Sequence, residues 1–146
     1  MLYCQKGSTK KKKEGDKKTP KGMFEIENLY FRKDRIKKPL TSLKCIEIKK
    51  NMGWCNDIKS KNYNKLIKIN SETKYEKMYR TDYKYDYVIP INYNTKRTRL
   101  GKGSAIFIHL TKNYLPTAGC VGIKKKDMLI LLKLINKKTR IKIFDN

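Results

Sequence analysis

The chain has 146 residues, and its 37 Lys and Arg against 13 Asp and Glu give a formal net charge of +24. This length fits one domain that buries a core without obligatory disulfides or metal ions. No stretch approaches the ~20 apolar residues of a membrane-spanning helix, and the start, MLYCQKGSTK, lacks the apolar segment of a signal peptide. Taken alone, the composition argues against a helical membrane protein and predicts a soluble chain that is not exported.

The positive charge has two interpretations. A charge of this size attracts nucleic acids, anionic membranes and other polyanions. Only six of the basic residues are Arg, however, which leaves 31 Lys, and Arg is the better residue for specific phosphate and base contacts. We therefore expect the run Lys10–Lys13 to be solvated surface. The rival hypothesis is a small basic nucleic-acid-binding protein that uses KKKKEGDKK, KRTR and the tyrosines.

The first half of the chain predicts short strands joined by irregular loops. Residues 2–18 are polar and Lys-rich, which predicts the end of a strand followed by an exposed loop. Apolar residues alternate at Phe24 and Ile26, which indicates a strand with one buried face. Residues 31–72 are irregular, with strand candidates at 45–48 and 66–69 and a predicted loop around Gly53 and Trp54.

The pattern becomes sharper from residue 85. One face of YDYVIPINYN is apolar, but Pro90 cannot donate to a ladder and so predicts an edge position or a bulge. That face consists of Tyr87, Ile89, Ile91 and Tyr93. The next strand, SAIFIHL at residues 104–110, is apolar on both faces and predicts a strand buried in a sandwich or barrel. Its two faces are Ala105, Phe107 and His109, and Ile106, Ile108 and Leu110.

The last part of the chain predicts a helix and a strand. Apolar residues at helical spacing indicate an amphipathic helix that packs on the sheet, and these residues are Met128, Leu131, Leu132 and Ile135. TRIKIF, residues 139–144, predicts a final strand. We therefore expect a mainly β fold with one C-terminal helix.

The single histidine, His109, lies shortly before Cys120, which is flanked by small residues in PTAGCVGI. A thiol with the ordinary pKa of ~8.5 is mostly protonated at neutral pH. An adjacent imidazole converts it to the thiolate and returns the proton to a leaving amine. Amide N–H groups beside Gly119 can hold the oxyanion, and the Leu110 carbonyl can fix the imidazole tautomer. The pair therefore predicts acyl transfer.

The other cysteines indicate no metal centre. Cys4, Cys45 and Cys55 form no C-x-x-C pair and no Cys/His cluster, so we expect neither a zinc site nor a cofactor. If Cys120 is a thiol, the remaining three allow at most one internal disulfide, and its pairing stays open.

The segments GSAIFIHL and PTAGCVGI resemble the catalytic stretch of the L,D-transpeptidase (YkuD-type) domain, in the branch that reads approximately G-S-A-I-F-x-H and P-T-x-G-C. KKEGDKKTPKGMFEI is similar to the family's E-G-D-x-x-T-P-x-G-x-F segment, and GWCNDIKSKNYNKLI to its G-W-C-x-D loop with a later Y-N. YRTDYKYDYVIPINYN is similar to the segment before the catalytic strand. The last helix and strand are similar to the family's C-terminus, so the resemblance runs from about residue 4 to the end.

This resemblance implies a β-sandwich or barrel with one C-terminal helix, and a cysteine acyltransferase that acts on peptidoglycan stem peptides. Cys120 would be the nucleophile and His109 the general base and acid. The Leu110 carbonyl would orient the imidazole, and the loop Ala118–Gly119–Cys120 would form the oxyanion hole. The partners implied are a donor tetrapeptide and an acceptor amine, with no specific nucleic acid. We expect a monomer that lacks the family's first strand and that, if the full-length protein is exported, works in the periplasm or cell envelope.

Two departures from the commonest family motif, S/T-H-G-C followed by x-R, bear on substrate binding. Ala118 replaces a histidine, and Gly122 replaces the arginine, so a lysine or Arg80 is expected to substitute in binding a substrate carboxylate. Tyr85 and Thr117 are further substrate-binding candidates, and Trp54 either joins them or caps the core. Cross-linking, lipoprotein attachment and stem-peptide trimming all stay open, as does a non-catalytic domain that only binds peptidoglycan.

Overall fold

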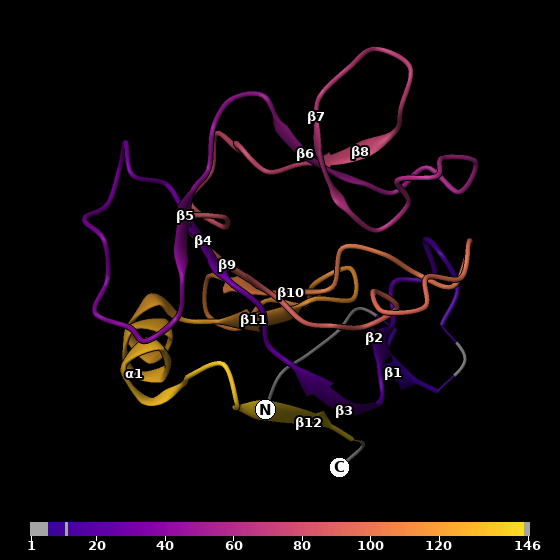
Figure 1. Ribbon diagram of the computed structural model, residues 1–146. Helices are drawn as coiled ribbons and strands as arrows, with labels where there is room; N and C mark the ends of the chain where they lie inside the picture. The colour runs from indigo at the N-terminus through magenta and orange to yellow at the C-terminus, as the bar shows by residue number, and fades with distance from the viewer. Residues whose placement is uncertain (1–5, 11, 145–146) are drawn as a thin grey trace.

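A five-stranded mixed sheet forms the centre of the computed structural model, which describes residues 6–10 and 12–144 (Figure 1). In spatial order its strands are β11 (Val121–Ile123), β10 (Phe107–Leu110), β9 (Tyr87–Pro90), β4 (Leu29–Phe31) and β5 (Cys45–Glu47). The strand β9 runs antiparallel to β10 and β4, whereas the outer pairs β10–β11 and β4–β5 are parallel.

Smaller elements cover both faces of this sheet. On one side lies an antiparallel three-stranded sheet of β7 (Leu66–Lys68), β6 (Met52–Cys55) and β8 (Tyr75–Lys77). On the other side lie α1 (Lys125–Leu134) and the antiparallel pair β3 (Gly22–Glu25) and β12 (Arg140–Ile143). A short parallel pair, β1 (Ser8–Thr9) and β2 (Thr19–Pro20), completes the described elements.

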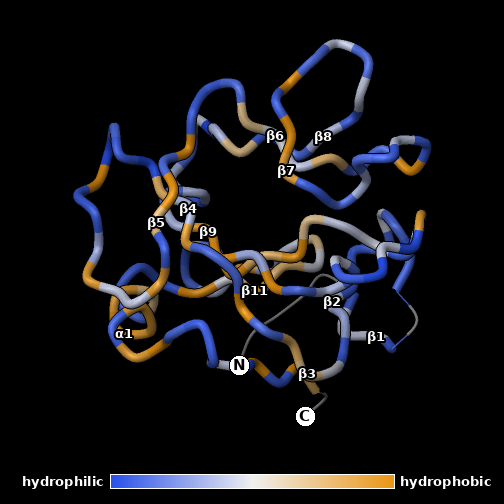
Figure 2. The backbone as a smooth tube through the Cα atoms, in the orientation of Figure 1, coloured by the Kyte–Doolittle hydropathy of each residue, from blue (hydrophilic) through white to orange (hydrophobic). Residues whose placement is uncertain are grey.

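Two apolar clusters occupy the two faces of the central sheet. The first contains Leu29, Ile89 and Ile108 from the sheet together with Met128 and Leu132 of α1. The second lies toward the three-stranded sheet and is made of Tyr30, Ile48, Trp54, Met78, Tyr85, Val88 and Phe107. Apolar residues are concentrated in the central strands and α1, and polar residues in the connecting loops (Figure 2). The strand β10 is buried throughout because it contributes to both clusters.

The mainly β fold with a C-terminal helix packed on the sheet is confirmed. The predicted faces of β10 are confirmed as well, since Phe107 joins one cluster and Ile106, Ile108 and Leu110 the other. The helix buries Met128 and Leu132, as its spacing predicts. The structure also has strands β4, β8 and β11, which the sequence pattern did not predict. In the part of the chain that the structure describes, no helix has the length and apolar character to cross a membrane.

One local prediction was wrong, and one of the two alternatives for Pro90 is excluded. The expected loop at Gly53 and Trp54 is strand β6, in which Gly53 makes room for an aromatic ring: a Cβ at this position would lie 2.8 Å from Cδ2 of Tyr75. Pro90 does not mark an edge, because β9 lies between β10 and β4. The alternative of a bulge fits the register instead. Tyr30 pairs with Val88 but Ile26 pairs with Ile91, so residues 26–30 contain one residue more than residues 88–91 opposite them, and Pro90 lies in this irregular stretch.

The prediction that Lys10–Lys13 is solvated surface was also wrong at one position. Lys10 and Lys13 are exposed, but Lys12 is buried and its ammonium lies 2.6 Å from Oδ1 of Asp16. Residue 11 lies outside the described residues. The burial follows from contacts with distant glycines, which a local charge pattern does not reveal.

The packing of α1 on the sheet predicts a contrast between two leucines of the same helix. Leu132 is fully buried, so Leu132→Ala should lower the free energy of unfolding by about 2–5 kcal/mol. Leu134 is 75% exposed, so Leu134→Ala should change it by less than ~0.5 kcal/mol. Urea unfolding followed by circular dichroism measures both, and equal losses would contradict the packing described.

Candidate active site

Strand pairing brings His109 and Cys120 to the same face of the central sheet. Strands β10 and β11 are parallel, with His109 aligned to Gly122, and Cys120 comes directly before β11. Residues paired across strands share a face, and side chains alternate along a strand. Consistent with this placement, Cys120 packs against the cluster that contains Phe107, and the His109 ring lies 5.2 Å from the ring of Tyr85. Both side chains therefore face the three-stranded sheet.

The His109 imidazole is held in one orientation. Its Nδ1 lies 2.8 Å from the carbonyl oxygen of Leu110. Because a carbonyl only accepts, Nδ1 carries the proton and the Nε2 lone pair is left to take one from a neighbouring group. Burial lowers the pKa of His109, and the nearby charges of Lys84 and Arg80 lower it further. The imidazole is therefore neutral near pH 7, as a proton acceptor must be.

The Cys120 thiol is partly exposed, at the end of a turn with fixed geometry. Its Sγ lies 3.3 Å from the carbonyl oxygen of Ala105, and the Thr117 hydroxyl donates to the Cys120 carbonyl. The preceding Gly119 has φ +119°, and a Cβ there would lie 2.8 Å from the Lys18 carbonyl oxygen. Only glycine fits this position without strain, which fixes the backbone next to the sulfur.

A groove of about 520 Å³ contains both His109 and Cys120. Its remaining lining residues are Glu14, Gly15, Lys17, Asn56, Glu76, Arg80, Lys84, Tyr85, Ser104, Ala105, Thr111, Lys112, Leu115, Pro116, Thr117 and Ala118. The sequence-predicted residues Arg80, Tyr85, Thr117 and Ala118 thus line one groove with the thiol and the imidazole. Gly119 is buried behind it, and the side chain of Leu110 lies in the core on the opposite face of the sheet.

Tyr85 and Arg80 form one wall of the groove. The Tyr85 hydroxyl donates to Oε1 of Glu76 at 3.0 Å, and its buried ring packs against His109. Arg80 lies over the Tyr85 ring and binds Asp82 at 2.7 Å and Glu76 at 3.4 Å. Burial raises the pKa of Tyr85, so its hydroxyl stays protonated as a donor. Arg80 is thus already engaged by two carboxylates.

Trp54 is a core residue and does not line the groove. It is 4% exposed, and its ring packs edge-on against Phe107 at 5.2 Å. Its Nε1–H donates to Oδ1 of Asn64 at 2.9 Å, and the same oxygen accepts the Ala105 N–H at 3.0 Å. Trp54 therefore supports the backbone beside Cys120 from within the core. Of its two predicted roles, the structure fits the core cap and not a place in the groove.

Three residues around the groove were missed from the sequence. Asn64 connects Trp54 to Ala105, and its amide also donates to two backbone carbonyls. Glu14 accepts hydrogen bonds from the Tyr63 and Ser104 hydroxyls. Asn64 belongs to the Y-N segment and Glu14 to the E-G-D segment, so the family motifs include both residues but indicate no role for them. Lys84 had no sequence signal that separates it from other lysines.

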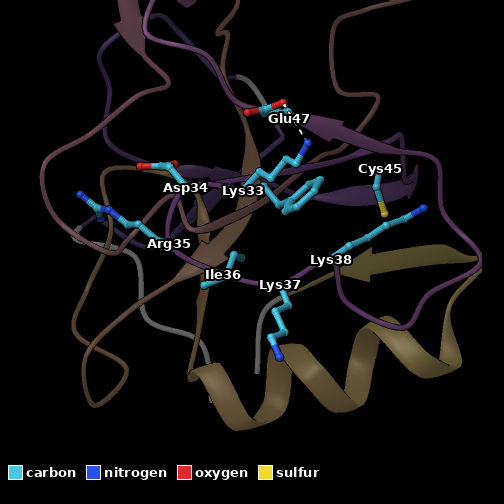
Figure 3. Close-up of a pocket in the computed structure, with 9 residues that line it drawn as sticks. Lys33, Asp34, Arg35, Ile36, Lys37, Lys38, Cys45 and Glu47 are labelled. Carbon is cyan, nitrogen blue, oxygen red and sulfur yellow. Dashed lines mark ion pairs between the residues drawn. The ribbon is translucent and has the colours of Figure 1, made fainter.

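Neither Cys45 nor Cys55 forms a second thiol–imidazole pair. Cys55 is buried, and Cys45 lies in a separate pocket of about 660 Å³ with Lys33, Asp34, Arg35, Lys37, Lys38 and Glu47 (Figure 3). That pocket contains no imidazole, since the sequence has one histidine and it lies in the other groove. Cys4 lies outside the described residues. Among the residues described, no group of three or more His, Cys, Asp or Glu side chains could hold a metal ion.

Comparison with protein families gives one result. The family described as the L,D-transpeptidase catalytic domain (YkuD) matches residues 3–143. No curated protein and no solved structure matches the chain. The match spans the groove and every strand that positions it.

The lowered pKa of His109 predicts how thiol reactivity depends on pH. The neutral imidazole takes the thiol proton, so alkylation of Cys120 by iodoacetamide should fall only below pH ~6.5, the ordinary histidine value. In His109→Ala the fall should move up toward ~8.5, the range of an unassisted thiol. Peptide mass spectrometry reports this site alone, and identical profiles for the two proteins would exclude a thiol–imidazole pair.

Proposed function

Since the chain belongs to the family of L,D-transpeptidase catalytic domains (YkuD), we propose that it is a cysteine acyltransferase acting on peptidoglycan stem peptides. The observation that carries the proposal is the shared groove of Cys120 and His109, in which the imidazole presents Nε2 and is fixed through Nδ1. Because peptidoglycan lies in the cell envelope, the reaction belongs there, where it would cross-link or remodel the wall.

The first half of the reaction forms a thioester. Nε2 of His109 takes the Cys120 proton, and the sulfur attacks the carbonyl carbon of the diamino acid in a donor tetrapeptide. The amides of the Ala118–Gly119–Cys120 turn would hold the resulting oxyanion. When the tetrahedral species collapses, the carbon–nitrogen bond breaks, and His109 gives its proton to the nitrogen of the departing D-alanine. The acyl group then stays on the sulfur.

The second half transfers the acyl group. An amine of a second stem peptide attacks the thioester carbonyl, and His109 accepts the proton that the nitrogen loses. The carbon–sulfur bond breaks, and the thiolate regains that proton from the imidazole. With water in place of the amine, the same steps trim the stem peptide. The outcome depends on which acceptor reaches the groove.

Substrate carboxylate binding cannot use residue 122 in this chain. A Cβ at Gly122 would lie 2.9 Å from Cγ2 of Thr117 and 3.0 Å from Cβ of Thr111, so the space that an arginine would need is filled. Lys84 and Lys112 line the groove, and neither forms a salt bridge within the described part of the chain. These two ammonium groups are the ones we propose for binding the terminal carboxylate of the donor.

The proposed chemistry predicts a covalent adduct. Intact-protein mass spectrometry after incubation with a carbapenem or a donor tetrapeptide should show the adduct on the wild type and on Cys45→Ala, and none on Cys120→Ala. His109→Ala should slow its formation by about 10²–10⁴-fold. Nucleic-acid binding that is steeply salt-dependent and indifferent to Cys120→Ala, without any adduct, would instead support the rival function. Retention on peptidoglycan without an adduct would indicate a binding domain.

The proposed lysines predict a substrate-dependent effect. Lys84→Met should lower kcat/KM for a tetrapeptide by about tenfold, because one charge-assisted contact is lost, and should change it little for the C-terminal amide of the same peptide. Lys68→Met is the matched control, since Lys68 is exposed on β7 outside the groove. Equal losses for the acid and the amide would exclude carboxylate recognition by Lys84.

A further inference from the structure

Lys12 is the one buried lysine among the residues that the structure describes, with 5% of its surface exposed. It does not line the groove, so a substrate cannot touch it there. Lys12 also has no role in the steps of the proposed reaction. A buried ammonium is costly unless it is paired, and its surroundings therefore indicate why it is retained.

Asp16 supplies the counter-charge of Lys12 and organises the segment between them. Its Oδ1 accepts from the Lys12 ammonium at 2.6 Å and from the Lys18 amide at 2.9 Å, while Oδ2 accepts from the Lys13 amide at 2.8 Å. Burial raises the pKa of Asp16, but these three bonds outweigh it and the net pKa is lowered. The carboxylate is therefore ionised, and residues 12–18 form a fixed turn.

This turn packs against the backbone on both sides of the thiol. The Lys12 stem occupies the space beside Gly103, where a Cβ would lie 2.8 Å from Cε and 2.9 Å from Cδ. A Cβ at Gly119 would lie 3.5 Å from the Lys12 Nζ and 2.8 Å from the Lys18 carbonyl oxygen. Lys12 thus joins the segment that leads into β10 to the glycine that precedes Cys120.

Stability alone does not explain such a pair, because well-packed apolar residues often replace a buried ion pair without loss. Position offers a better reason. The Lys12 Nζ is among the three atoms nearest to a Cβ at Gly119, and no atom of Asp16 is, so the ion pair directs its positive end toward the Gly119 turn. In this buried region that end would lie behind the amides proposed to hold the oxyanion.

We propose that Lys12, held by Asp16, is a positioning residue for acyl transfer, which supports the Gly119–Cys120 turn and adds positive charge behind its oxyanion-binding amides. This inference rests on the proposed function. It differs from a purely structural role in one respect: it should affect reactions that form an oxyanion and spare those that do not.

The test compares two reactions of the same sulfur in the full chain. Acylation by a carbapenem passes through an oxyanion, whereas alkylation by iodoacetamide does not. Lys12→Met should lower the acylation rate constant by about tenfold or more while changing the alkylation rate constant by less than about twofold. Lys12→Arg should restore most of the acylation rate. Lys13→Met is the matched control, because Lys13 is an exposed neighbour outside the groove.

Thermal unfolding of each variant separates folding from chemistry. If Lys12→Met does not fold, Lys12→Gln serves as the neutral variant, since its amide can still donate to Asp16. A wild-type rate of acylation in the neutral variant, or equal losses of acylation and alkylation, would overturn the inference and leave the proposed function intact. A wild-type protein that alkylates but never acylates would overturn both.

Discussion

The parallel pairing of β10 with β11 is the contact on which the rest of the site depends. It aligns His109 with Gly122 and so sets Cys120, at the start of β11, on the same face as the imidazole. A shift of one residue would turn the histidine into the opposite cluster. The register is held because β10 is apolar on both faces and buried between two clusters, each of which requires its own set of side chains.

Around this pairing, backbone positions are fixed from beneath by buried polar groups. Asn64 connects Trp54 to Ala105, whose carbonyl lies next to the thiol. Residues 12–18 pack behind Gly119, where any side chain would collide with them. Such contacts contribute little net stability, but unpaired they would each be costly, so they favour one arrangement of the turn over its alternatives. The backbone beside the thiol is thereby fixed, which the proposed oxyanion stabilisation requires.

Periodic features of the fold could be predicted from the sequence, and features that depend on distant partners could not. The spacing of Met128 and Leu132 identified the buried face of α1, and the two apolar faces of residues 104–110 identified β10. The local pattern at Gly53 predicts a loop, but the residue lies in strand β6 against the Tyr75 ring, a partner that is remote in the chain. Lys12 resembled its solvated neighbours for the same reason. Motif and chemistry predicted that His109 and Cys120 act as a pair, and the structure places both in one groove. For Trp54 the sequence left two alternatives open, and its burial depends on partners that are remote in the chain.

The central claim is that the imidazole is held as the Nδ1–H tautomer, which leaves Nε2 to accept the Cys120 proton in the proposed reaction. Because the chain has one histidine, a long-range proton–nitrogen NMR correlation spectrum at neutral pH reports this ring alone. The account predicts a protonated Nδ1, an unprotonated Nε2, and a displaced Nε2 resonance when Cys120 is replaced by alanine. An Nε2–H tautomer, or a spectrum indifferent to the loss of the thiol, would contradict it.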